Sequence, residues 1–196
     1  SYNEDIIELS KGFTFYKWNN KDSDKTPIIL VHGFSVPSYI WQPTFDMLSE
    51  KGYYVIALDL YGRGFSENLN ENYTDELMAN QVLELLNELN IKSAKLIGLS
   101  NGGRIISKVA DLKPKIVEKL IYVASSGFKK IREVSNKSVT NKEVTDFIKK
   151  NYAQIAAGQL NDFKYPEKHI GWDEKYEELL KYKGFARALI STKKNH

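Results

Sequence analysis

A glycine–serine–glycine motif, Gly98-Leu99-Ser100-Asn101-Gly102, is the part of this 196-residue sequence that most directly suggests chemistry. A serine hydroxyl becomes a nucleophile when it is exposed, held in place and deprotonated by a neighbouring base. A sharp turn can lift its oxygen above the backbone. Glycines two residues before and two residues after the serine let the flanking strand and helix pass closely. The spacing therefore predicts Ser100 as a nucleophile.

Two glycine-containing segments earlier in the chain could complete such a site. Each of them, His32-Gly33-Phe34 and Asp59 to Ser66, follows an apolar run directly. A negative charge develops on oxygen when an acyl carbon is attacked, and backbone N–H groups can stabilise it. We expect the N–H groups of Phe34 and Asn101 to do this, and we interpret Asp59 as a residue that fixes its own loop.

Apolar runs and helix-period segments predict the elements that hold these loops. Uninterrupted apolar runs cover residues 27–31, 55–58 and 120–124, and a further apolar run covers residues 94–97. Such runs are typical of strands covered on both faces in a parallel sheet. Helical periodicity separates them, and the stripe that begins at Leu77 follows Thr74, a predicted N-cap. Residues 1–127 are therefore predicted to be α/β, with the three loops at the carboxyl edge of the sheet.

After Gly127 the strand pattern gives way to helical periodicity. Gly158, Pro166 and Gly171 are expected to divide this part into about three helices. We predict that residues 128–190 form a helical lid over the sheet domain. Residues 191–196 are expected to begin the return of the chain to the sheet.

The segments Pro27 to Phe34, Asp59 to Ser66 and Gly98 to Gly103 resemble, in order and spacing, the three amino-terminal motifs of α/β-hydrolase-fold serine hydrolases. The resemblance covers nearly the whole chain and extends to the esterase and monoacylglycerol-lipase-like branch. It implies an α/β fold with a mostly parallel sheet, helices on both faces and an inserted helical lid. It also implies Ser100 as the nucleophile, with Phe34 and Asn101 as backbone oxyanion donors.

The same resemblance implies a catalytic acid and a histidine after the lid, and neither is recognised in this chain. Of its three histidines, His32 is interpreted as structural, His169 as a surface residue and His196 as a terminal one. We therefore expect an amino-terminal portion of a longer hydrolase, short by roughly 60 to 90 residues. Its C-terminal strands would be missing, and the chain alone would be inactive. Leu120 to Ala124 would then be an exposed sheet edge, which favours self-association.

The expected activity is hydrolysis of small carboxylic esters, with short to medium acyl chains or of the monoacylglycerol type, through an acyl-enzyme on Ser100. Five aromatic side chains are candidates for an apolar acyl pocket: Phe34, Trp41, Tyr61, Phe147 and Trp172. One alternative is a carbon–carbon bond hydrolase of the meta-cleavage type with the same machinery. Another is a non-catalytic α/β-hydrolase-fold binding protein that keeps the motif and lacks the triad.

Composition excludes several other classes of protein. The sequence has no cysteine, which rules out disulfides and a cysteine nucleophile. No apolar run approaches the ~18 residues of a membrane span, and no secretion signal is recognised, so a cytoplasmic location without stable membrane insertion is expected. Residues 128–196 carry 15 basic and 9 acidic side chains. Because these charges alternate, we interpret them as solvated helix faces and expect no nucleic-acid partner. The serine mechanism requires no metal or other cofactor, and none is expected.

Overall fold

The computed structural model describes residues 2–127 and 137–195, and in these ranges six strands form a sheet in the order β1-β2-β4-β3-β5-β6. The strands are β1 (Asn3–Glu8), β2 (Phe13–Asn19), β3 (Ile28–Val31), β4 (Val55–Leu58), β5 (Ala94–Leu99) and β6 (Val117–Val123). β1 and β2 form an antiparallel hairpin, and β2 runs antiparallel to β4. From β4 through β3 and β5 to β6, neighbouring strands are parallel. The mostly parallel sheet expected from the sequence is confirmed.

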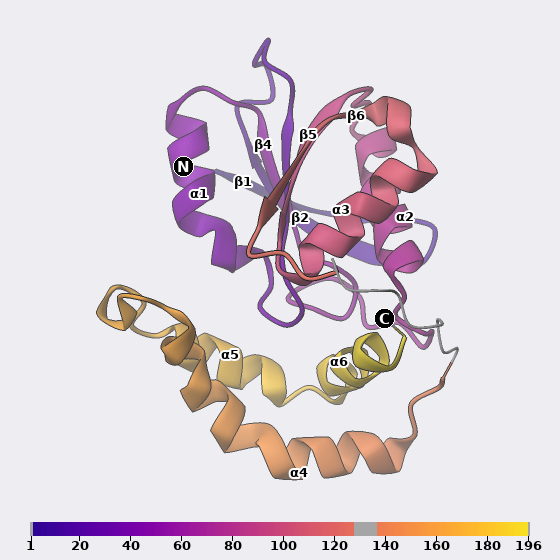
Figure 1. Cartoon of the computed structure of the whole chain (residues 1–196), viewed down its shortest axis with the longest axis vertical. Helices are drawn as coiled ribbons and strands as arrows, with labels where there is room; N and C mark the ends of the chain where they lie inside the picture. Colours follow the sequence, from indigo (N-terminus) through magenta and orange to yellow (C-terminus); the bar gives the residue numbers. More distant parts are fainter. Residues whose placement is uncertain (1, 128–136, 196) are drawn as a thin grey trace.

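Helices cover both faces of the sheet (Figure 1). They are α1 (Gln42–Glu50) on one face, with α2 (Asp75–Glu88) and α3 (Asn101–Leu112) on the other. Successive side chains of a strand point to opposite faces. Ile28 and Leu30 of β3 therefore pack with Phe45 of α1, whereas Ile29 and Val31 pack in the core under α2 and α3. This double burial explains the uninterrupted apolar runs.

The boundaries of the helices in the sheet domain agree with the capping signals in the sequence. The Leu77 N–H donates to the Thr74 Oγ1 at 3.1 Å, so Thr74 is the N-cap of α2 as predicted. α3 ends at Leu112, two residues before Pro114, which cannot continue a helix. At its other end, α3 begins at Asn101, directly after Ser100.

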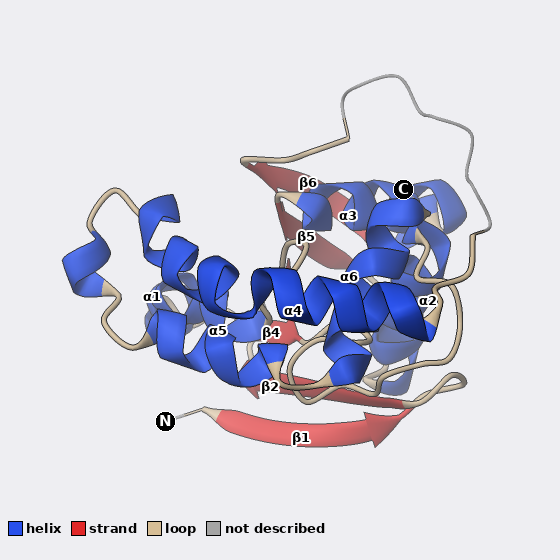
Figure 2. Cartoon of the chain, turned by 90° about the horizontal axis from the view of Figure 1, so that it is seen from below, coloured by secondary structure: helices blue, strands red, loops and turns tan. Residues whose placement is uncertain are grey.

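Beyond residue 137 the described chain is helical and forms the lid, which Figure 2 shows crossing in front of the sheet domain. Its α-helices are α4 (Asn141–Gly158), α5 (Trp172–Leu180) and α6 (Lys183–Lys194). α4 ends at Gly158 and α5 is capped by Gly171, as the sequence predicts. Within the described ranges, no helix is both long enough and apolar enough to cross a membrane.

The lid ends in a helical turn that contacts the sheet domain. Residues 191–194, part of the segment expected to begin the return to the sheet, form the last turn of α6. The Ser191 hydroxyl accepts the Tyr73 N–H at 2.9 Å, so this turn is held against the sheet domain. Residues 128–136, the predicted start of the lid, and His196 lie outside the described residues.

The two edge strands of the sheet, β1 and β6, differ in chemistry. β1 carries Glu4, Asp5 and Glu8, and such charges discourage pairing with another chain. On β6 the consecutive residues Ile121, Tyr122 and Val123 are all exposed, at 38%, 39% and 38%. Among the described residues no strand pairs with the outer side of β6. The segment Leu120 to Ala124 therefore lies along an edge of the sheet, as expected from the sequence.

We propose that the β6 edge makes this chain self-associate. Sedimentation velocity of the 196-residue chain should show a weight-average mass that rises with concentration. Ile121→Lys should weaken this association, because a lysine on an edge strand blocks strand pairing. Ile6→Lys on β1, at a side chain 55% exposed, is the matched control and should leave it unchanged. A wild-type chain that stays monomeric at several hundred micromolar would contradict the proposal.

Candidate active site

Ser100 occupies a strained turn between β5 and α3. Its backbone has φ 51° and ψ −116°, a region that residues with side chains rarely adopt. The Ser100 N–H donates to the Val123 carbonyl at 2.9 Å, and the Ser100 carbonyl accepts the N–H groups of Gly103 and Ser126 at 3.1 Å each. The end of β6 and the first turn of α3 therefore hold this conformation and leave the serine half-buried.

The two glycines of the motif are required by close backbone contacts. A Cβ on Gly98 would lie 2.5 Å from the Gly102 carbonyl oxygen, and a Cβ on Gly102 would lie 2.3 Å from the Val31 carbonyl oxygen. Neither position has room for a side chain. This confirms the steric reason for which the motif was singled out: β3, β5 and α3 meet at Ser100 with their backbones in contact.

The segments that carry both predicted oxyanion donors lie beside Ser100. A Cβ on Gly33 would lie 3.3 Å from the Ser100 Cβ and 3.9 Å from its Oγ, so the loop after β3 passes next to the hydroxyl. Phe34 follows in this loop. Asn101 opens α3, where the first N–H groups have no acceptor within the helix and the helix dipole favours negative charge. That Phe34 and Asn101 donate to an oxyanion stays a prediction.

His32 is a buried structural residue, as predicted from the sequence. It is fully buried, and its Nε2 accepts the Leu60 N–H at 2.9 Å, so the ring proton is on Nδ1. Nδ1 donates that proton to the Gly33 carbonyl at 2.9 Å. Burial lowers the pKa of His32 to about 3, and the positive charge of Arg63 acts in the same direction, although the bond to Gly33 opposes them. The neutral ring ties the β3 loop to the β4 loop.

Asp59 fixes the loop after β4, which confirms its interpretation from the sequence. Its carboxylate accepts the Ser38 N–H at 2.7 Å and the Phe65 N–H at 3.0 Å. Burial raises the pKa of this carboxyl above its ordinary value, and the hydrogen bonds from Ser38 and Phe65 oppose that shift. Each of the two carboxylate oxygens therefore accepts a hydrogen bond from a backbone N–H group.

The structure brings only some of the predicted pocket residues together. Phe34 and Phe147 pack against one buried apolar cluster of the lid, which contains Ala156, Tyr176, Leu180, Phe185 and Leu189. Trp172 lies edge-on to Tyr39, with ring centroids 5.3 Å apart. Trp41 belongs instead to the core under α1, and Tyr61 to the core under α2 and α3. These two are buried in cores on opposite faces of the sheet, so they do not line one pocket with the others.

No base is placed at Ser100 by the described residues. Within 2–127 and 137–195, no histidine nitrogen hydrogen-bonds the Ser100 hydroxyl. His169 is half-buried in the lid and stacks on Phe163, with ring centroids 3.9 Å apart. It was expected at the surface, and this partly exposed ring also packs against Trp172.

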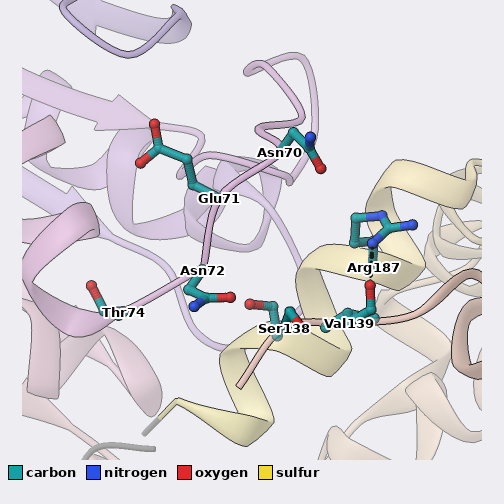
Figure 3. Close-up of a pocket in the computed structure, with 8 residues that line it drawn as sticks. Asn70, Glu71, Asn72, Thr74, Ser138, Val139 and Arg187 are labelled. Atoms are coloured by element: carbon teal, nitrogen blue, oxygen red, sulfur yellow. Dashed lines mark hydrogen bonds between the residues drawn. The ribbon is translucent and has the colours of Figure 1, made fainter. Parts of the chain in front are cut away.

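A polar hollow of about 530 Å³ lies away from these loops, between the segment before α2 and the lid. Its lining residues are Asn70, Glu71, Asn72, Thr74, Ser138, Val139, Arg187 and Ser191 (Figure 3). Arg187 donates to the Val139 carbonyl at 2.6 Å, and it therefore braces the lid. In the described part of the chain, no group of three or more histidines and carboxylates could hold a metal ion.

A serine on a strained strand–turn–helix elbow, at the carboxyl edge of a mostly parallel sheet under a helical lid, defines the class of α/β hydrolases. The family model for the alpha/beta hydrolase fold matches residues 26–196, and the chain belongs to this family.

Relatives and solved structures agree with this assignment. An uncharacterized hydrolase of Bacillus subtilis, YugF, is 32% identical over 120 residues, which are 61% of this chain and 44% of YugF. A pimeloyl-[acyl-carrier protein] methyl ester esterase of Aliivibrio fischeri is 34% identical over 133 residues, covering 64% of this chain and 49% of the esterase. The enol-lactonase of Burkholderia xenovorans superposes with a TM-score of 0.76 at 19% identity, over 97% of this chain and 74% of the lactonase, and bears on the fold alone. The chain thus spans about half the length of these two curated relatives.

Proposed function

We propose that the protein is a serine hydrolase that cleaves small carboxylic esters, with short to medium acyl chains or of the monoacylglycerol type. The observation that carries the proposal is the strained backbone of Ser100 with Gly33 beside its hydroxyl. Such strain persists only where the surroundings hold it, and it is concentrated at functional sites. The esterase relative of Aliivibrio fischeri supports ester cleavage as the reaction class.

In the proposed reaction the Ser100 Oγ attacks the acyl carbon while a histidine takes its proton. The tetrahedral oxyanion accepts hydrogen bonds from the N–H groups of Phe34 and Asn101. The alcohol leaves with a proton from that histidine, and water then hydrolyses the acyl-enzyme. Because the described residues place no base at Ser100, the proposal requires a histidine and an acid from elsewhere in the complete protein.

Labelling by a fluorophosphonate probe tests this proposal. The protein encoded by the natural gene should be modified at Ser100, and Ser100→Ala should reduce labelling by several orders of magnitude because the nucleophile is lost. Ser93→Ala, at an exposed serine before β5, is the matched control. The 196-residue chain alone should label far more slowly than the complete protein.

The alternative with a distinct outcome is the non-catalytic binding protein. It is favoured by the absence of a base at Ser100 among the described residues. If the natural protein leaves Ser100 unmodified at probe concentrations that label a control esterase, the hydrolase proposal fails. If Ser100 is labelled, a panel of esters and diketones then separates an esterase from a carbon–carbon bond hydrolase.

A further inference from the structure

Arg63 is a buried cation between the loop that carries Phe34 and the last helix of the lid. It is 2% exposed, and its guanidinium makes four hydrogen bonds. Nε and Nη2 donate to the Phe34 carbonyl at 3.0 and 2.9 Å. Nη1 donates to the Tyr61 carbonyl at 3.1 Å, and Nη2 also donates to the Thr192 Oγ1 at 2.8 Å.

The two peptide units on either side of Phe34 are clamped by different side chains. The Gly33–Phe34 peptide supplies the Phe34 N–H, and its carbonyl accepts the Nδ1 proton of His32. The following peptide offers the Phe34 carbonyl to the fork of Arg63. Together the two contacts restrict rotation about Phe34 and therefore fix the direction of its N–H.

The same guanidinium connects this loop to the lid. Thr192 lies in the last turn of α6, and its hydroxyl is in reach of Arg63 only because α6 is seated against the sheet domain. Phe34 and Val36 of the loop also pack on the lid cluster that contains Phe185. The loop is therefore connected to the lid both by the hydrogen bond from Arg63 to Thr192 and by the apolar packing of Phe34 and Val36.

The charge of Arg63 is not explained by an ion pair. Among residues 2–127 and 137–195, no carboxylate forms a salt bridge with it. Burial lowers the pKa of the guanidinium to about 10, so it stays charged at neutral pH. A buried cation is costly, and an apolar side chain of similar volume often packs as well or better. The two hydrogen bonds from the guanidinium to the Phe34 carbonyl hold that peptide in place, which an apolar side chain could not do.

We propose that Arg63 is a positioning residue that holds the Phe34 loop in its oxyanion-binding geometry and makes that geometry depend on the seat of α6. The role in catalysis rests on the proposed function. The physical link between the loop and α6 does not, and it can be measured without activity.

Hydrogen–deuterium exchange of the 196-residue chain measures the link. Arg63→Met should speed exchange in residues 32–37 by about tenfold or more, because hydrogen bonds to a charged group are lost. Arg63→Lys should restore part of the protection, since a lysine can donate to the Phe34 carbonyl without the fork. Thr192→Val should speed exchange in both 32–37 and 183–195. Arg104→Met, which removes an arginine paired with Asp75 at 2.7 Å, is the matched control and should leave 32–37 unchanged.

Unchanged exchange in residues 32–37 of a folded Arg63→Met variant would overturn the proposal. If Arg63→Met does not fold, the Thr192→Val variant provides the test. Faster exchange in α6 without faster exchange in residues 32–37 would equally overturn the proposal.

Kinetics of the complete protein on an ester add a second readout. Arg63→Lys should lower kcat by about tenfold to a hundredfold with KM within about twofold, since the transition state depends on the Phe34 N–H and ground-state binding does not. A change in KM alone would reject the positioning role. If the wild type shows no Ser100 chemistry, the proposed function fails, and the exchange data still decide whether Arg63 links the loop to α6.

Discussion

Gly102→Ala should strongly destabilise the protein. The added Cβ would lie 2.3 Å from the Val31 carbonyl oxygen and 2.6 Å from the His32 carbonyl oxygen. Both atoms are backbone at the end of β3, whose four residues are buried and paired on both sides by β4 and β5. The strand cannot move away without breaking the centre of the sheet. We expect a loss of about 3 kcal/mol or more, a large part of the stability of an ordinary domain.

Gly158→Ala is the matched control for that substitution. A Cβ there would meet nothing within 4 Å, and the residue has φ −75° and ψ −17°, which alanine adopts readily. Because alanine restricts the unfolded chain more than glycine does, this variant should be neutral or more stable by up to about 1 kcal/mol. Urea unfolding followed by circular dichroism compares the two. Equal urea midpoints for the two variants would contradict the prediction, because they would show that the turn at Ser100 can accommodate a Cβ at residue 102.

The sheet and the elbow could be predicted from the sequence because their signals are local. β3 and β4 are buried on both faces, and such strands appear as continuous apolar runs. Likewise, the glycines around Ser100 report a backbone contact that depends only on the strand–turn–helix geometry. The N-cap at Thr74 involves residues three apart and is local in the same sense.

The features that the sequence did not predict depend on partners far along the chain. Trp41 and Tyr61 were candidates for one pocket, but periodicity does not say which face of the sheet an aromatic will cover. The last turn of α6 is polar and is held by Tyr73, which is 118 residues away from Ser191. Arg63 was noted only as part of a glycine-rich motif, because its partner Thr192 is 129 residues distant.

Acid should destabilise the protein through His32, and replacing this residue should remove that part of the pH dependence. Above pH 6.5 the ring is neutral in both the native and the unfolded state. As the pH falls from 6.5 towards 3, the unfolded chain binds a proton that native His32, with its pKa lowered to about 3, does not. The free energy of unfolding then decreases by up to about 1.4 kcal/mol per pH unit from this residue alone, or about 4 kcal/mol in all.

Other groups titrate in the same range, so the comparison must isolate His32. Asp59 acts in the opposite direction, because its raised pKa lets the native state hold a proton that the unfolded state has lost. We therefore expect the difference between wild type and His32→Gln, measured by urea unfolding at pH 7.5, 6, 5 and 4, to shrink steadily as the pH falls. Ser93→Ala, at the exposed serine before β5, is the matched control and should keep the wild-type slope. Parallel curves for wild type and His32→Gln would mean that native His32 takes up a proton as readily as the unfolded chain, and that its bonds to Leu60 and Gly33 do not hold the ring neutral.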